Sequence, residues 1–124
     1  MQAHRDVLIA IVDDDDSFRI AMEGLIRSLG YRAAGYASAE LFLGSETGRD
    51  ADCIISDIQM PGMSGMEMKR RLDAEGRNMA VIFVTAHTDA ALYRQAMECG
   101  AAALLHKPFE GQLLIDKLHG ALGL

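Results

Sequence analysis

The sequence has few basic residues and no long hydrophobic run. Its 12 lysines and arginines stand against 18 aspartates and glutamates, which gives a formal net charge of −6. Because nucleic-acid phosphates repel an acidic surface, this balance argues against direct nucleic-acid binding. No apolar stretch approaches the roughly 18 residues that a membrane-spanning helix needs. The start, MQAHRD, lacks the apolar segment of a secretory signal. We therefore expect a soluble, cytoplasmic protein that does not enter a membrane.

Cysteine is also scarce, with only Cys53 and Cys99 in the chain. Their spacing matches no metal-binding pattern, and a disulfide is not expected in a cytoplasmic protein. Cys53 lies inside an apolar run, which favours a small core residue. The one basic cluster, KRR at 69–71, is interpreted as a solvated helix face.

What the sequence does contain is enough apolar material for one core. Of its 124 residues, half are hydrophobic and 24% are charged. This composition is typical of a single folded domain and argues against disorder. We find no linker, low-complexity segment or second domain, so one domain is expected over residues 1–124.

Two kinds of apolar segment alternate along the chain. Short, continuously apolar runs predict strands that are covered on both faces; they fall at 7–12, 32–37, 53–56, 81–85 and 102–106. Helical spacing of apolar residues fills the intervals and follows the last run. Five strand–helix units in strict alternation predict an α/β fold, a doubly wound parallel sheet with helices on both faces.

Local signals mark the ends of the helices. Gly30 is expected to stop the first helix, and Ser38 to start the second. Ser64 and Glu67 have the spacing of a capping box. Thr88 or Asp89 is expected to start the fourth helix, which a glycine at 100 ends.

Polar residues follow four of the five expected strands. Asp13 and Asp14 end the first, Asp57 the third, Thr85 the fourth and Lys107 the fifth. In a doubly wound sheet the functional crevice lies outside the carboxyl ends of the strands, so these groups should converge. Crowded carboxylates suit Mg²⁺, which prefers oxygen ligands. A carboxylate can also attack phosphorus and form an aspartyl phosphate, whose charge a metal and a lysine would neutralise.

The run DDDD at 13–16 therefore has two interpretations. Asp13 and Asp14 are candidates for the site. Asp15 and Asp16 are expected to start the following helix, because aspartate is a favoured N-cap and acids in a first turn complement the helix dipole.

Four blocks in this order resemble the receiver domain of response regulators in two-component signalling, a CheY-like superfamily. The blocks are IVDDDDSFR, ISDIQMPGMSGMEM, VIFVTAH and LLHKPF, and they extend the resemblance over the whole chain. The stretches YASAELFL and TAHTD are most similar to the FixJ-like subgroup. The resemblance implies a flavodoxin-like (βα)5 fold with strand order 2-1-3-4-5.

Carried over residue by residue, the resemblance implies a phosphoacceptor and a metal site. Asp57 accepts the phosphoryl group. Asp14, Asp57 and the backbone carbonyl of Gln59 bind Mg²⁺, with Mn²⁺ as a substitute, and Asp13 holds a metal-bound water. The cofactor is therefore expected to be a divalent cation.

The resemblance also implies how the site is modulated. Lys107 contacts the phosphoryl group, and its bond to Pro108 is expected to be cis. Thr85 is the switch hydroxyl. Gln59 and His87 tune the lifetime of the phosphoaspartate, although His87 could equally be a solvated loop residue.

One position departs from the family pattern. Many receivers carry an aromatic residue in the fifth strand, where this chain has Leu104. A leucine can repack but has no ring to swing inward. We expect the face formed by the fourth helix, fifth strand and fifth helix, around Leu92, Leu104 and Leu113, to respond with a smaller amplitude.

The function implied is a phosphorylation-controlled switch rather than a general enzyme. A histidine kinase or phosphotransfer protein would donate the phosphoryl group, and the domain would catalyse transfer to, and hydrolysis from, its own Asp57. Output would pass through protein contact, relay or homodimerisation on the face just described, since no output domain is expected in the chain. Alternatively, the chain is a receiver excised from a longer regulator. The downstream target is unknown.

Two alternatives stay open at this point. A haloacid-dehalogenase-like phosphatase also places Asp-x-Asp after its first strand, and Asp13-x-Asp15 fits formally. A non-phosphorylated receiver-like interaction module would have the same fold, although such modules typically lack one of the acidic pair, the acceptor or the lysine.

Overall fold

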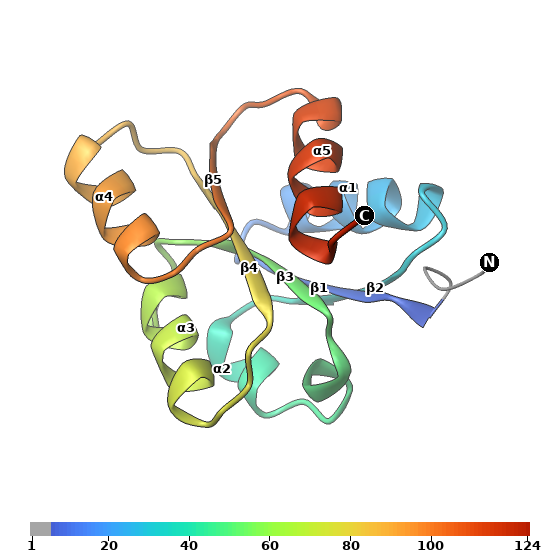
Figure 1. Cartoon of the computed structure of the whole chain (residues 1–124), viewed down its shortest axis with the longest axis horizontal. Coiled ribbons are helices and arrows are strands. Elements are labelled where there is room, and N and C mark those ends of the chain that lie inside the picture. The colour runs from blue at the N-terminus through green and yellow to red at the C-terminus, as the bar shows by residue number, and fades with distance from the viewer. Residues whose placement is uncertain (1–5) are drawn as a thin grey trace.

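The computed structural model describes residues 6–124. Figure 1 shows the described strands and helices alternating along the chain. The strands are β1 (Leu8–Val12), β2 (Arg32–Tyr36), β3 (Cys53–Asp57), β4 (Ala80–Thr85) and β5 (Ala103–His106). The helices are α1 (Asp16–Ser28), α2 (Ala39–Leu43), η2 (Thr47–Asp50, a 3-10 helix), α3 (Gly65–Ala74), α4 (Ala90–Glu98) and α5 (Gly111–Leu122). Most of the MQAHRD start, on which the absence of a signal segment was argued, lies outside the described residues.

The strands form one parallel sheet in the order β2-β1-β3-β4-β5. This confirms the doubly wound topology and the strand order. The expected strands are shifted by at most a residue at each end, and β3 extends to Asp57 itself. In Figure 1, α1 and α5 cover one face of the sheet, while α2, α3 and α4 cover the other.

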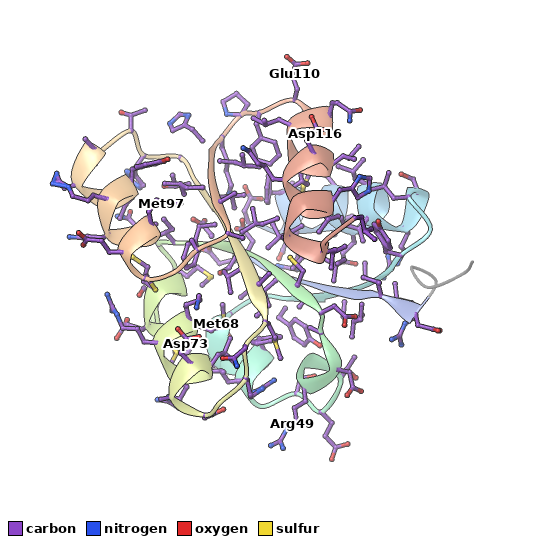
Figure 2. All side chains as sticks on the ribbon, viewed as in Figure 1. Arg49, Met68, Asp73, Met97, Glu110 and Asp116 are labelled. Atoms are coloured by element: carbon purple, nitrogen blue, oxygen red, sulfur yellow. The ribbon has the colours of Figure 1, made fainter. Side chains whose placement is uncertain are left out.

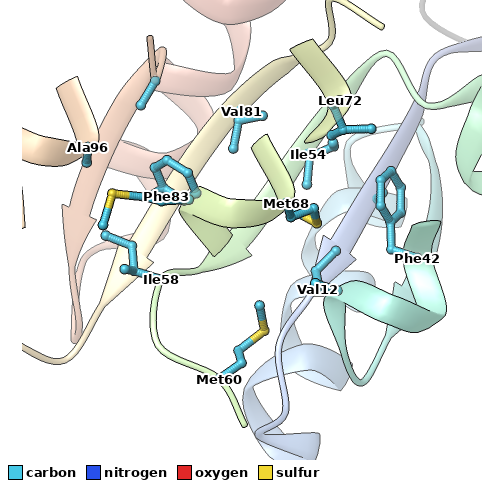
Figure 3. Close-up of a cluster of buried hydrophobic side chains, with 14 of the residues drawn as sticks. Val12, Phe42, Ile54, Ile58, Met60, Met68, Leu72, Val81, Phe83 and Ala96 are labelled. Carbon is cyan, nitrogen blue, oxygen red and sulfur yellow. The ribbon is translucent and has the colours of Figure 1, made fainter. Parts of the chain in front are cut away.

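Each face of the sheet has its own apolar core. All five residues of β1 are buried, as the continuous apolar run predicts. On one face Phe42, Met68 and Leu72 pack against the sheet (Figure 3). On the other, Ile26 of α1 and Leu114 of α5 belong to a second buried cluster. The central strands β1, β3 and β4 are therefore held rigidly from both sides, which fixes the positions of the residues at their ends. The edge strand β2, also expected to be covered on both faces, has only exposed and partly buried residues.

The helix starts follow the local signals. The side chains of Ser38, Ser64 and Asp89 each accept a hydrogen bond from a backbone N–H in the first turn of the helix that follows. Ser64 and Glu67 form the reciprocal capping box. Gly30 has a φ of 92°, a left-handed conformation that ends α1.

One expectation about the surface is wrong. The KRR segment is not uniformly solvated, because Lys69 is only 7% exposed. Lys69 lies on the same stripe of α3 as Met66 and Leu72, three residues away on either side, so its stem is covered. Its ammonium reaches the Asp73 carboxylate at 2.8 and 2.9 Å. Asp73 is labelled on α3 in Figure 2. Arg70 and Arg71 are exposed, as expected.

The cysteines behave as the sequence indicates. Both are free thiols. Cys53 is fully buried, and this burial raises the pKa of its thiol to about 12. Within residues 6–124, no helix has the length and apolar character needed to cross a membrane.

Candidate functional site

Three carboxylates gather at the carboxyl edge of the sheet. Asp13 and Asp14 follow β1, and Asp57 ends the neighbouring strand β3. One oxygen from each of the three lies within 4.8 Å of the others. Asp13 is fully buried, Asp57 is partly buried and Asp14 is exposed. The topology therefore joins residues that are more than 40 positions apart in the sequence.

Lys107 supplies the positive charge of this cluster. It follows β5, and its Nζ donates to Asp13 Oδ2 at 2.9 Å and lies 3.5 Å from Asp57 Oδ2. Burial alone would lower the pKa of the ammonium, but the hydrogen bond to Asp13 and the charge of Asp57 outweigh burial and raise it. Lys107 is thus held in the charged form. The Lys107–Pro108 peptide bond is cis.

The two carboxylates that share Lys107 are not equivalent in their surroundings. Burial raises the pKa of Asp57, the charge of Lys107 opposes this shift, and the charge of Asp13 adds to it. The net direction is upward because burial outweighs the opposing charge of Lys107. A divalent cation at this point would favour the ionised carboxylate.

The segment that follows Asp57, residues 58–65, packs closely against the end of β3. The Gln59 N–H donates to Asp57 Oδ1 at 3.3 Å. Gly65 begins α3 directly against β3, where a Cβ would collide with the Asp57 carbonyl oxygen. Gly62 has a φ of 79°, and the adjacent Met63 N–H donates to Glu40 of α2 at 3.0 Å. The PGMSG stretch therefore turns the chain tightly back against the end of β3.

Thr85 lies at the same edge, at the end of β4. Its side chain is almost fully buried, and its Oγ1 accepts a hydrogen bond from the His87 N–H at 3.0 Å. The His87 side chain is exposed. Both residues line a cavity of about 300 Å³ whose wall also includes Leu104. The structure thus connects the end of β4 to the β5 position that departs from the family pattern.

The four consecutive aspartates divide as the sequence indicates. Asp15 is the N-cap of α1, and its side chain accepts a hydrogen bond from the Phe18 N–H at 3.2 Å. Asp16 is in the first turn and pairs with Arg19 at 2.7 Å. Because the Asp15 carboxylate is engaged at the helix end, the Asp13-x-Asp15 pattern of a haloacid-dehalogenase-like phosphatase is not assembled here.

Sequence reasoning missed two residues of α1 that contact this cluster. Arg19 Nη1 donates to the backbone carbonyl of Asp13 at 2.8 Å. The Lys107 ammonium lies 4.0 Å from the centre of the Phe18 ring. A helix that starts beside the carboxylates turns some side chains of its first turn back toward them. The position of Phe18 and Arg19 in that first turn was the available signal.

The donor set fits a hard divalent cation. The three carboxylates offer oxygen atoms only, and they stand on rigid strand ends. No sulfur or imidazole belongs to the group, which argues against a soft metal. Asp13, Asp14 and Asp57 are therefore the residues that could hold Mg²⁺.

A parallel five-stranded sheet with an acidic cluster and a lysine at its carboxyl edge defines a CheY-like fold. The response regulator receiver domain model matches residues 9–119. The chain therefore belongs to the response regulator receiver domain family, the phosphorylation-controlled signalling domains of two-component systems. Receiver domains typically use Mg²⁺, and Asp13, Asp14 and Asp57 could hold such an ion here.

Known proteins give the same result. The chain is 39% identical over 115 residues to the transcriptional regulatory protein FixJ of Azorhizobium caulinodans, covering 93% of this chain and 54% of FixJ. It is 33% identical over 120 residues to the response regulator protein TodT of Pseudomonas putida, covering 97% and 53% respectively. The chain thus spans about half the length of these relatives. The resemblance to the FixJ-like subgroup is confirmed.

Solved structures share the fold. The crystal structure of FixJ-N superposes with a TM-score of 0.86 and 31% identity, over 95% of this chain and 94% of that one. A receiver protein from Burkholderia phymatum gives a TM-score of 0.83 and 41% identity, over 96% and 97%.

Proposed function

We propose that Asp57 is the phosphoacceptor of this receiver domain. The observation that carries the proposal is the convergence of Asp13, Asp14, Asp57 and Lys107 from three separate strand ends. In the transfer, an Asp57 carboxylate oxygen forms a bond to phosphorus while the bond to the donor's leaving group breaks. Asp57 keeps part of its surface exposed, so a donor can reach it.

Lys107 and Thr85 would act on the transferred group. The Lys107 ammonium, already 3.5 Å from Asp57 Oδ2, is placed to neutralise charge on a phosphoryl oxygen. The Thr85 hydroxyl would donate to another phosphoryl oxygen. Its bond from the His87 N–H would link any movement of the hydroxyl to the β4–α4 loop.

The proposal includes a magnesium site. Asp14, Asp57 and the Gln59 carbonyl would hold Mg²⁺, or Mn²⁺ in its place, with Asp13 bound through water. The cation supplies charge neutralisation at the transferring phosphoryl group. The protein's part is to keep these oxygens on rigid strand ends.

Hydrolysis of the phosphoaspartate belongs to the same proposal. Gln59 and His87 are both exposed and flank the site, one after β3 and one after β4. Side chains at these positions would control how water approaches the phosphorus, and so set the lifetime of the activated state. The domain would then act only on its own Asp57.

A sensor histidine kinase or a phosphotransfer protein would be the donor. Because phosphohistidine is made from ATP, a cytoplasmic location is part of this proposal. The output would be a change in affinity for a protein partner, since two conformations differ in what they bind.

The proposed output face comprises α4, β5 and α5. Tyr93 and Met97 of α4 and Leu113 of α5 are exposed by 54%, 38% and 42%. Met97 and Asp116 lie on these two helices in Figure 2. Apolar groups on one such face are typical of a surface that is covered by a partner, here a second copy of the domain.

Labelling by acetyl phosphate tests the phosphoacceptor. Wild type is expected to incorporate acid-stable but base-labile label in the presence of Mg²⁺, and Asp57→Asn to incorporate none. Asp16→Asn is the matched control, because Asp16 is exposed and engaged with Arg19; it should label like wild type. Label that persists in Asp57→Asn and disappears in Asp13→Asn would favour a hydrolase instead. No label together with no Mg²⁺ binding would favour a non-phosphorylated module.

Sedimentation tests the output face. Beryllofluoride, a phosphoryl mimic, is expected to increase the weight-average mass of the wild type, and Tyr93→Asp to prevent this. Ile20→Asp on α1 is the control, since Ile20 is 63% exposed but lies away from the face. A mass that stays monomeric with the mimic bound would contradict homodimerisation.

A further inference from the structure

The Phe18 side chain of α1 lies against the ammonium of Lys107. The Nζ atom is 4.0 Å from the centre of the ring, well inside the roughly 6 Å range of a cation–π contact. Lys107 comes from the loop between β5 and α5, 89 positions further along the chain. The contact is possible because α1 and α5 cover the same face of the sheet (Figure 1).

The Phe18 ring is itself held in place by Phe109, which lies in the same loop as Lys107. Phe109 meets Phe18 edge to face, with ring centres 6.1 Å apart and an angle of 82° between the planes. Both rings pack against the apolar cluster beneath α1 and α5. Phe18 is therefore fixed on one side by the core and by Phe109, and presents its face to Lys107 on the other.

The ammonium is thus bounded on three sides. Asp13 accepts its hydrogen bond at 2.9 Å, Asp57 lies at 3.5 Å, and the Phe18 ring covers a third direction. A lysine side chain has four flexible methylene groups, and fixing it costs conformational entropy. The negative face of an aromatic ring offsets part of this cost without adding another carboxylate to an already crowded site.

We propose that Phe18 is a positioning residue for phosphoryl transfer: its ring holds the Lys107 ammonium beside Asp57 before the donor arrives. Phe18 does not touch the reacting atoms, and acts only through Lys107. Without the ring, Lys107 samples positions directed toward solvent, and fewer molecules present the charge where it is needed. This role rests on the proposed function of Asp57 and Lys107.

The experiment must separate this role from simple core packing. Phe18→Leu and Phe18→Met keep an apolar side chain but remove the ring. Phe18→Tyr keeps the ring. Met22→Ala is the packing control, because Met22 lies one turn further along α1 against the same core cluster and is not part of the site.

The first measurement is NMR of Lys107 in the metal-free, unphosphorylated protein. The chain has three lysines, so Lys69 and Lys117 serve as internal references. The Lys107 Hε protons are expected upfield in wild type, Phe18→Tyr and Met22→Ala, because the face of a ring shields them. The upfield shift should disappear in Phe18→Leu and Phe18→Met.

The second measurement is the rate of labelling by acetyl phosphate at saturating Mg²⁺. Phe18→Leu and Phe18→Met should label about two- to fivefold more slowly, the size expected for a cation–π contact at a partly exposed site. Phe18→Tyr and Met22→Ala should label at the wild-type rate.

The two measurements distinguish an error in the proposed function from an error in the positioning role of Phe18. If wild type does not label at all, the proposed function is wrong, while the NMR shift still reports whether the ring holds Lys107. If Phe18→Leu and Phe18→Met lose the shift but label as fast as wild type, or faster, the positioning role is overturned. It is also overturned if Phe18→Tyr behaves like Phe18→Leu, or if the Lys107 shift does not depend on the ring.

Discussion

The charges at the site do not balance at the scale of single residues. Asp13, Asp14 and Asp57 bring three carboxylates together, and Lys107 is the cation that contacts two of them. Arg19 is also close, but it binds the backbone carbonyl of Asp13 and the Asp16 carboxylate rather than the three carboxylates of the cluster. An excess of negative charge therefore stays in a partly buried place. Such an arrangement lowers stability while favouring a cation, and both effects are measurable.

Asp57→Asn should make the metal-free protein more stable at neutral pH. The pKa of Asp57 lies above its ordinary value of 3.8, with burial as the main cause. The native state therefore holds this proton to a higher pH than the unfolded state does. Ionisation of Asp57 then decreases the free energy of unfolding as the pH rises from about 3.8 through the folded pKa.

Urea unfolding in EDTA, measured from pH 3.5 to 7, checks this prediction. The free energy of unfolding of Asp57→Asn should exceed that of the wild type only slightly at pH 3.5, and the difference should grow as the pH rises. A difference that stays constant with pH, or a less stable variant at pH 7, would contradict the assigned direction of the pKa.

Mg²⁺ should stabilise the wild type and do so much less in Asp14→Ala. A ligand that binds only the native state adds about 2.7 kcal/mol at a concentration 100 times its Kd. Asp14→Ala removes one carboxylate of the cluster. Thermal unfolding with and without Mg²⁺ measures the effect. Asp16→Ala is the control, since the Asp16 side chain is 77% exposed and pairs with Arg19; it should leave the metal effect nearly unchanged.

At the scale of elements, the helix ends were predictable because capping is local. Ser38, Ser64 and Asp89 each bond a backbone N–H two or three residues away. The central strands β1, β3 and β4 were equally predictable, since a strand covered on both faces must be apolar throughout. The edge strand β2 is not covered in this way, and its run is the weaker signal. Lys69 was not predictable in the same way. Its burial depends on which side of α3 faces the turn after α4, where the end of the Lys69 side chain lies close to Gly100.

Ser64→Ala should cost about 0.5–2 kcal/mol of stability. The substitution removes the acceptor of the Glu67 N–H and half of the capping box at the start of α3. Urea unfolding measures the loss. Ser28→Ala is the matched control: its exposed hydroxyl donates to a helix carbonyl, and its removal should change stability by no more than about 0.5 kcal/mol. Equal losses in the two variants would show that the cap does not stabilise α3.

At the scale of the whole molecule, we expect Leu104 to limit how far a change at Asp57 is transmitted. Its side chain is partly buried and borders two cavities, one shared with Thr85 and one with Phe109 and Leu113. Space is therefore available on both sides of β5. A leucine fills less of this space than an aromatic ring, so movement of Thr85 displaces less of the surrounding structure.

Amide-shift mapping with beryllofluoride should show changes across α4, β5 and α5 that are smaller than those in Leu104→Phe. The larger ring couples Thr85 to the surface by filling the cavity of about 300 Å³ beside it. Wild-type changes confined to the acidic crevice would contradict transmission to this face. Identical maps for the two proteins would contradict the role given to residue 104.

The sequence by itself determined the alternation of strands and helices, the caps, and which polar residues end which strand. Each of these depends on contacts within a few positions or on the period of the apolar pattern. Only the tertiary structure decided which of the converging groups bond to one another. The bond between Lys107 and Asp13 joins residues 94 positions apart, and the ring of Phe18 reaches the same ammonium from a third element. Packing on both faces of the sheet sets these distances, and no local pattern encodes them.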